Sequence, residues 1–131
     1  MKKILLVFLG MTLFLTLQAQ SYGIRYTKTY VVNVDNSSMS KVEDANTAIV
    51  FSFSKEIFTV IEKNKVGEAV SWEYNMYNIK WNSDLVSWYF YHEREKYMAN
   101  LNQGDYTFSY RKVGTPITKI FAGGVFLGKS D

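Results

Sequence analysis

One short stretch of the chain holds the residue types that could support metal chemistry. His92, the only histidine, stands beside Glu93 and Glu95, and an imidazole with carboxylates can bind a divalent metal ion. The same stretch separates two alternating apolar segments, which is typical of a solvated hairpin turn. We therefore interpret His92 as a turn residue, and we expect no metal site and no cofactor.

The rest of the sequence lacks the spacing of a catalytic site. Nucleophilic catalysis needs a serine or threonine near a base, and the pattern assigns no hydroxyl to the sole histidine. Asp84 and Asp105 are typical turn formers. None of the carboxylates is expected to lie buried beside another, so no raised carboxyl pKa is implied. We expect a protein that is not an enzyme.

Aromatic residues that share one face of the expected strands form the stronger candidate site. Their rings suit flat, apolar or carbohydrate ligands, and a buried phenol needs a hydrogen-bond partner that a ligand could supply. The candidate ligand-binding residues are Trp72, Trp81, Trp88, Tyr97 and Tyr110. The competing interpretation is that these rings simply fill the core, because large side chains leave little volume inside a small barrel.

Alternation of apolar and polar residues predicts the strands that carry these rings. The expected strands are 24–34, 47–53, 56–62, 68–81, 85–91, 96–101, 105–111 and 117–122. Within 68–81 the apolar residues change from even-numbered to odd-numbered positions, which predicts a β-bulge or a sharp bend near residues 75–78. In the last strand Lys119 interrupts the apolar face.

Turn lengths predict which residues lie opposite each other. A polar turn centred on residues 93–94 sets Trp88 opposite Ala99 and Phe90 opposite Tyr97. Three further turns fix other pairs: residues 54–55 set Phe51 opposite Phe58, residues 63–67 set Phe58 opposite Trp72, and residues 103–104 set Ala99 opposite Phe108.

Two segments fall outside this pattern. Residues 35–46 form a polar excursion too long for a hairpin turn. We expect one helical turn at 40–45 and regard the excursion as the only plausible lid. Residues 122–131 are expected to be a glycine-rich tail.

Sequential antiparallel strands with one apolar face hide that face by curling into a closed or nearly closed barrel. We therefore predict an all-β fold, a small antiparallel up-and-down meander of about eight strands. The architecture resembles the calycin-like barrels. The resemblance is topological only, because the Gly-x-Trp signature of lipocalins is matched at best by Gly23-Ile24-Arg25, without the Trp. An open, strongly curled sheet is the structural alternative.

Residues 1–20 have the pattern of a cleaved secretory signal peptide, with Lys2 and Lys3 before an uncharged run over residues 4–17. That run is shorter than the roughly 20 residues of a membrane-spanning helix. Residues 21–131 are expected to be a single β-barrel-like domain. Without the two leading lysines the balance is 13 basic against 12 acidic residues, which indicates no nucleic-acid partner. We expect a secreted or periplasmic protein of bacterial type.

We expect this exported protein to bind a small apolar, aromatic or carbohydrate ligand, inside the barrel or at its mouth under residues 35–46. The alternative is an envelope-associated interaction module, an inhibitor or accessory subunit with a filled core. Its contact surface for a protein partner or a second copy would be the outward-facing Ile57, Ile61, Tyr89 and Met98.

Overall fold

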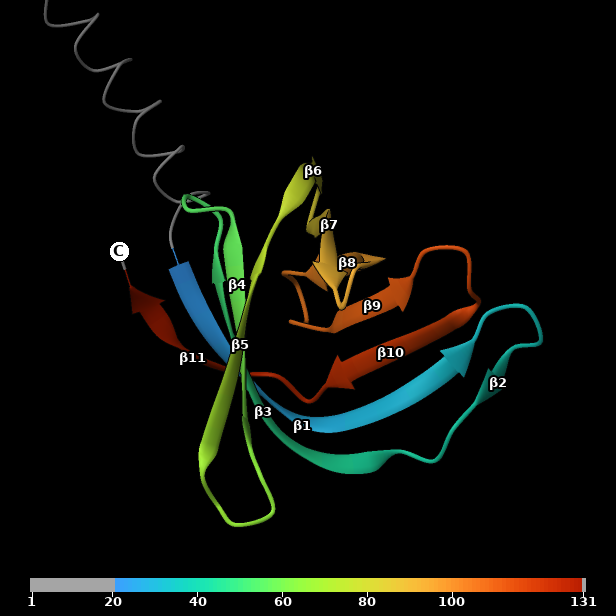
Figure 1. Ribbon diagram of the computed structural model, residues 1–131, viewed down its shortest axis with the longest axis horizontal. Helices are drawn as coiled ribbons and strands as arrows, with labels where there is room; N and C mark the ends of the chain where they lie inside the picture. The colour runs from blue at the N-terminus through green and yellow to red at the C-terminus, as the bar shows by residue number, and fades with distance from the viewer. Residues whose placement is uncertain (1–20, 131) are drawn as a thin grey trace, which may run out of the picture.

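Figure 1 shows a computed structural model, which describes residues 21–130. Every element in this range is a strand: β1 (Ser21–Asn33), β2 (Ser38–Met39), β3 (Glu43–Ser52), β4 (Ile57–Lys63), β5 (Ala69–Asn75), β6 (Tyr77–Asn82), β7 (Leu85–His92), β8 (Glu95–Asn102), β9 (Phe108–Lys112), β10 (Ile117–Ala122) and β11 (Val125–Ser130). The expected signal peptide lies outside the described residues. The predicted all-β fold is confirmed, with eleven strands in place of about eight.

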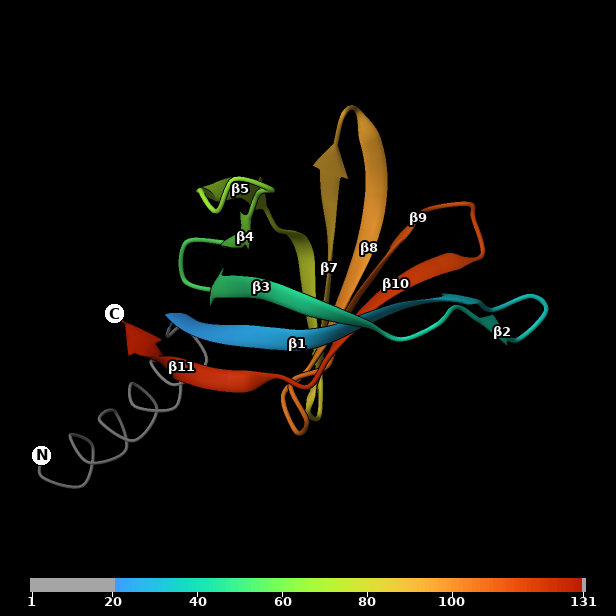
Figure 2. The same cartoon turned by 90° about the horizontal axis from the view of Figure 1, so that it is seen from below.

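The strands form one antiparallel up-and-down sheet that curls into a half-barrel. Its order is β5-β4-β3-β1-β10-β9-β8-β7-β6, and β2 and β11 pair with β1. Figure 2 shows β1 running between β3 on one side and β10 and β11 on the other. The early and late parts of the chain are therefore joined along β1.

The expected strand 68–81 is one length of chain that bends at Met76. This residue is buried, and its N–H donates a 2.7 Å hydrogen bond to the carbonyl of Glu56. The first half, β5, pairs with β4, and the second half, β6, pairs with β7. The pairing of β6 shifts register after Tyr77, where Asn78 has a left-handed φ of 54°. The predicted bend is confirmed, and it lets one strand border both β4 and β7 (Figure 1).

Two hairpins have the predicted register. Trp88 lies opposite Ala99 and Phe90 lies opposite Tyr97, while Phe51 lies opposite Phe58. In both hairpins the connection is short, so the turn leaves a single way to align the apolar faces.

The predicted pairing of β8 with β9 is wrong by two residues. Ala99 lies opposite Tyr110 instead of Phe108. The connection is a wider loop, because the side-chain Oδ1 of Asn102 accepts a 2.8 Å hydrogen bond from the N–H of Gly104. Side-chain capping of this kind lengthens a turn that glycine alone would have made tight.

The predicted pairing of β4 with β5 is wrong by the same amount and for the same reason. Phe58 lies opposite Tyr74 instead of Trp72. Between the strands, Oδ1 of Asn64 accepts hydrogen bonds from the N–H groups of Val66 and Glu68, at 3.1 and 2.9 Å. Both displacements are even, so every side chain keeps the face that the alternation assigns to it.

Residues 35–46 do not contain the expected helical turn. β2 pairs with β1, and Oγ of Ser40 accepts a 2.8 Å hydrogen bond from the N–H of Val31. β3 already begins at Glu43. The backbone of this excursion is thus satisfied by an adjacent strand, which leaves little reason for a helix to form.

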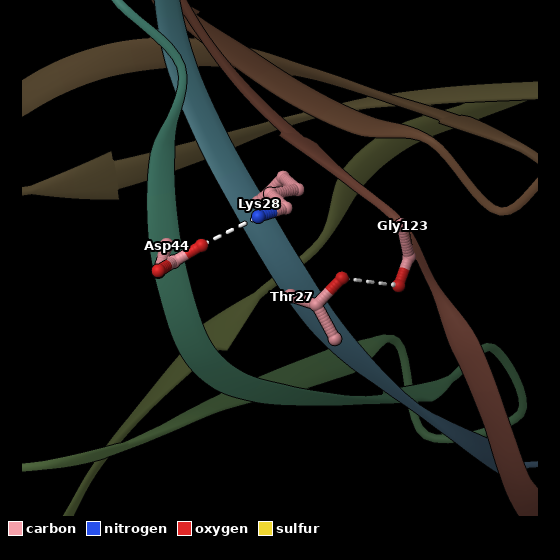
Figure 3. Close-up of polar contacts among 4 residues, drawn as sticks. All are labelled: Thr27, Lys28, Asp44 and Gly123. Carbon is pink, nitrogen blue, oxygen red and sulfur yellow. Dashed lines mark hydrogen bonds and ion pairs between the residues drawn. The ribbon is translucent and has the colours of Figure 1, made fainter.

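The expected tail is instead strand β11, which pairs with the start of β1. Gly123 turns the chain with a φ of 64°, and its carbonyl accepts a 3.1 Å hydrogen bond from Oγ1 of Thr27 (Figure 3). The next residue of β1, Lys28, places its Nζ 2.5 Å from Oδ1 of Asp44 on β3. These contacts tie β1 to its neighbours on both sides.

The core is a cluster of rings and aliphatic side chains inside the curl of the sheet. Its largest fully buried members are Trp88, Tyr26, Phe51, Phe58, Phe108, Ile24, Ile49, Leu101 and Val86. The indole of Trp88 contacts the rings of Phe51, Phe58 and Phe108, with centroids 5.4 to 6.0 Å apart. In this part of the molecule, aromatic side chains fill the interior.

Candidate functional site

A cavity of about 260 Å³ lies inside the half-barrel, beside the filled core. Strands β3, β4, β5, β7, β8, β9 and β10 all contribute to its wall. The lining residues are Ile49, Phe58, Val60, Glu62, Trp72, Tyr74, Phe90, His92, Tyr97, Phe108, Tyr110, Lys119 and Phe121. The segment 35–46, expected to act as a lid, contributes no lining residue.

Four phenylalanine rings form the apolar part of the wall: Phe58, Phe90, Phe108 and Phe121. The rings of Phe58 and Phe90 meet edge to face at 5.1 Å, and Phe90 stacks on Tyr97 at 5.2 Å. Edge-to-face and stacked contacts of this kind hold aromatic rings in fixed orientations. The cavity therefore offers a flat apolar ligand a preformed surface.

Polar groups also line the cavity. The hydroxyl of Tyr74 lies 3.0 Å from Nδ1 of His92. The carboxylate of Glu62 accepts a 3.4 Å hydrogen bond from Oγ1 of Thr47. A ligand in the cavity would therefore meet phenol, imidazole and carboxylate groups as well as apolar rings.

Burial and a nearby negative charge raise the pKa of two of the phenols. Burial, and to a smaller degree the charge of Glu62, raises the pKa of Tyr110 to about 12. Burial and the same carboxylate also raise the pKa of Tyr74. At physiological pH both phenols are neutral and can donate a hydrogen bond.

The structure brings three of the five expected ligand-binding residues together. Trp72, Tyr97 and Tyr110 line the cavity, with Trp72 41% exposed at its rim. Trp88 is 1% exposed inside the core and does not line the cavity. Trp81 lies beyond the bend on β6, where its ring packs against Phe53 at 4.9 Å. The bend at Met76 carries Trp81 away from the cavity.

The interpretation of His92 as a solvated turn residue holds in part: its side chain is 40% exposed, but the residue borders the turn and does not lie within it. The turn consists of Glu93 and Arg94, whose φ values of 51° and 67° are both left-handed. His92 is consequently the last residue of β7, and its ring contacts those of Tyr74 and Tyr97. A two-residue turn of this type matches the twist of the flanking strands.

Glu62, the last residue of the expected strand 56–62, lines the cavity but was not among the expected site residues. The sequence pattern could have placed it there, because Phe58, Val60 and Glu62 are alternate residues of β4 and so lie on the same face of the strand. Lys119 was recognised as an interruption of an apolar face, and it also lines the cavity. In both cases a charged residue at an inward position marks the site.

A metal site is not formed by the described side chains. Within residues 21–130 there is no group of three or more His, Cys, Asp or Glu residues that could hold a metal ion. Nε2 of His92 lies 3.7 Å from Oε1 of Glu93. The same stretch of chain holds no helix that could cross a membrane.

The outward residues expected to form a contact surface fall in two regions of the sheet. Ile57 and Ile61 lie on β4, whereas Tyr89 and Met98 face each other across β7 and β8. All four are half-buried. Lys96 covers the ring of Tyr89, with Nζ 4.3 Å from the ring centroid. An interface through these residues stays a prediction.

Comparisons with known proteins add no further information: no protein-family model matches the chain, and searches of curated proteins and of solved structures found no match.

Proposed function

We propose that this chain, exported after removal of residues 1–20, is a non-catalytic binding protein for a small ligand with an apolar, aromatic body and a polar group. The observation that supports the proposal is the cavity, in which phenylalanine rings and neutral tyrosine hydroxyls line one space. Ligand sites combine a mainly apolar wall with a few polar groups that fix orientation.

The size and chemistry of the wall narrow the ligand. A volume of about 260 Å³ is below the range of roughly 300 to 1,000 Å³ typical of drug-sized ligand sites, so a ligand of one or two rings fits best. Phenylalanine offers no partner for sugar hydroxyls, and an unpaired buried hydroxyl costs free energy. The wall therefore favours an aromatic body over a carbohydrate.

A curled up-and-down sheet with an internal cavity is also the arrangement expected of a calycin-like barrel. Barrels of about eight strands can hold one small ligand inside. We propose that the half-barrel is a calycin-like barrel that is not fully closed. It would differ from a closed barrel between β5 and β7, which form no strand pairing within the described residues.

Calorimetric titration of the mature protein with naphthamide, a neutral two-ring compound, tests the proposal. Val60 lines the cavity, and Val60→Trp places a large ring in the space that the ligand would occupy. Thr59→Trp, on the opposite face of β4, is the matched control. We expect binding by the native protein and by Thr59→Trp, and at least about tenfold weaker binding by Val60→Trp.

Two results would reject the proposal. One is the absence of measurable binding by the native protein to naphthamide and related one- and two-ring compounds. The other is equal affinity of the native protein and Val60→Trp, because the ligand would then bind elsewhere. Circular dichroism of both variants checks that the sheet has formed.

A further inference from the structure

Lys119 is a basic residue on the inward face of a strand. It lies on β10 opposite Tyr110, between Ile117 and Phe121 on the same face. Among the residues that line the cavity it is the only lysine or arginine. A lysine on an inward face is costly unless its ammonium meets water or an opposite charge.

The described residues provide no carboxylate for this ammonium. The ion pairs found within residues 21–130 join Lys28 to Asp44, His92 to Glu93 and Lys112 to Glu95. The Nζ of Lys119 instead lies 5.2 Å from the centroid of the Phe121 ring. The ammonium is thus held at the cavity wall without a counter-charge from this part of the protein.

A second, more open hollow of about 300 Å³ adjoins the cavity at the same lysine. It is lined by Tyr97, Tyr110, Lys112, Thr115, Ile117 and Lys119, and Tyr97, Tyr110 and Lys119 also line the cavity. No carboxylate lines this hollow. Its side chains present two ammonium groups, and that of Lys112 is 3.4 Å from Glu95.

The one carboxylate of the cavity belongs to a different wall. Glu62 lies on β4, whereas Lys119 lies on β10, and the two side chains are not within 4.0 Å of each other. A negative charge on a ligand would be repelled by Glu62 and attracted by Lys119. Lys119 also lines the open hollow and Glu62 does not, so an anionic group is favoured on the side of the open hollow.

We propose that the ligand is an organic acid, an aromatic carboxylate or sulfonate whose anionic group binds Lys119 where the two hollows meet. The inference rests on the proposed binding function and specifies its ligand class. The aromatic body lies against the phenylalanine rings, and the acid group points away from Glu62 toward the open hollow. Lys112 is already paired with Glu95, which leaves Lys119 as the binding group for the anion.

Three naphthalene derivatives of similar size separate charge from shape: naphthoate is an anion, naphthamide is neutral and naphthylmethylammonium is a cation. We expect the native protein to bind naphthoate about five to ten times more tightly than naphthamide, because a partly buried charge-assisted hydrogen bond is worth that factor. Binding of the cation should be the weakest. Each affinity is measured by calorimetry at one fixed salt concentration, since ionic screening changes the preference.

Variants then assign the preference to one side chain. Lys119→Met should abolish the preference for naphthoate over naphthamide and leave naphthamide affinity nearly unchanged, whereas Lys119→Arg should keep it. Lys96→Met removes an outward lysine and is the matched control, with no expected change. Glu62→Gln should strengthen naphthoate binding, because it removes the repelling charge.

The outcomes distinguish failure of this inference from failure of the binding function. If naphthamide binds in the cavity but naphthoate binds no more tightly, or if Lys119→Met leaves the preference intact, the organic-acid inference is wrong. If the cation binds most tightly and Glu62→Gln removes that advantage, the ligand is an organic amine instead. If none of the three compounds binds, both the inference and the proposed function are wrong.

Discussion

Replacement of Trp88 tests the packing of the core that borders the cavity. Its ring lies 5.4 Å from that of Phe58, 5.9 Å from those of Phe51 and Phe53, and 6.0 Å from that of Phe108. Truncating a buried aromatic residue to alanine costs about 3 to 5 kcal/mol. A small domain has a total stability of about 5 to 15 kcal/mol, so Trp88→Ala should remove a large fraction of it.

A second substitution at the same position removes the polar group with a much smaller loss of volume. The Nε1–H of Trp88 is buried and finds no hydrogen-bond partner among the described residues, and an unsatisfied donor costs about 1 to 3 kcal/mol. Trp88→Phe loses ring volume but also removes this donor. We therefore expect Trp88→Phe to cost less than about 1.5 kcal/mol.

Urea unfolding followed by circular dichroism measures both variants without relying on tryptophan emission. Equal slopes of the unfolding curves would show that the midpoint shifts report stability. A loss below about 1 kcal/mol for Trp88→Ala would refute the packing around this ring. A loss well above about 1.5 kcal/mol for Trp88→Phe would refute the assignment of Nε1–H as an unsatisfied donor.

Three further substitutions test single features of the fold. Gly123→Ala should destabilise the protein more than Gly114→Ala. Both glycines have a positive φ, but only the Cβ added at Gly123 collides with a neighbouring atom, Oγ1 of Thr27; urea unfolding compares the two variants. At the bulge, Asn78→Ala should lower the free energy of unfolding by about 1 kcal/mol, whereas Asn78→Gly should leave it nearly unchanged, since glycine adopts the left-handed φ without strain. Urea unfolding measures both variants, and a larger loss for Asn78→Gly than for Asn78→Ala would contradict this. In the folded protein burial raises the pKa of Tyr110 from its ordinary value near 10 to about 12. The protonated phenol therefore contributes fully to stability below pH 10, and this contribution is lost as pH rises toward 12. Tyr110→Phe should therefore flatten the fall in stability over that range, and an unchanged slope would contradict the burial of this phenol.

Much of the sheet follows from local rules in the sequence. Alternation assigned the correct faces to the side chains of β5 and β9 even though their registers were wrong, because those two pairings are displaced by an even number of residues. The turns at residues 54–55 and 93–94 were placed correctly. Asn64 and Asn102 widened the other two by accepting hydrogen bonds from the backbone, and the lengths of such loops depend on contacts that residue type alone does not determine.

The cavity was only partly predictable. Tyr97 and Tyr110 could be assigned because they follow the alternation of long, regular strands. Trp81 does not line the cavity, because a bend of predicted position does not reveal in which direction the chain leaves it. The pairing of β11 with β1 joins the two ends of the described chain, and such long-range contacts leave no periodic signal in a glycine-rich segment.

The central claim is that a small aromatic ligand binds inside the half-barrel, and nuclear magnetic resonance mapping with naphthamide tests it most directly. The backbone amides of Phe90, Tyr97 and Tyr110 should shift in proportion to occupancy, because their side chains line the cavity. Those of Tyr77 and Tyr91, which are exposed and contact each other outside the cavity, should not. Shifts confined to Tyr77 and Tyr91, or no shifts at saturating ligand, would contradict the claim.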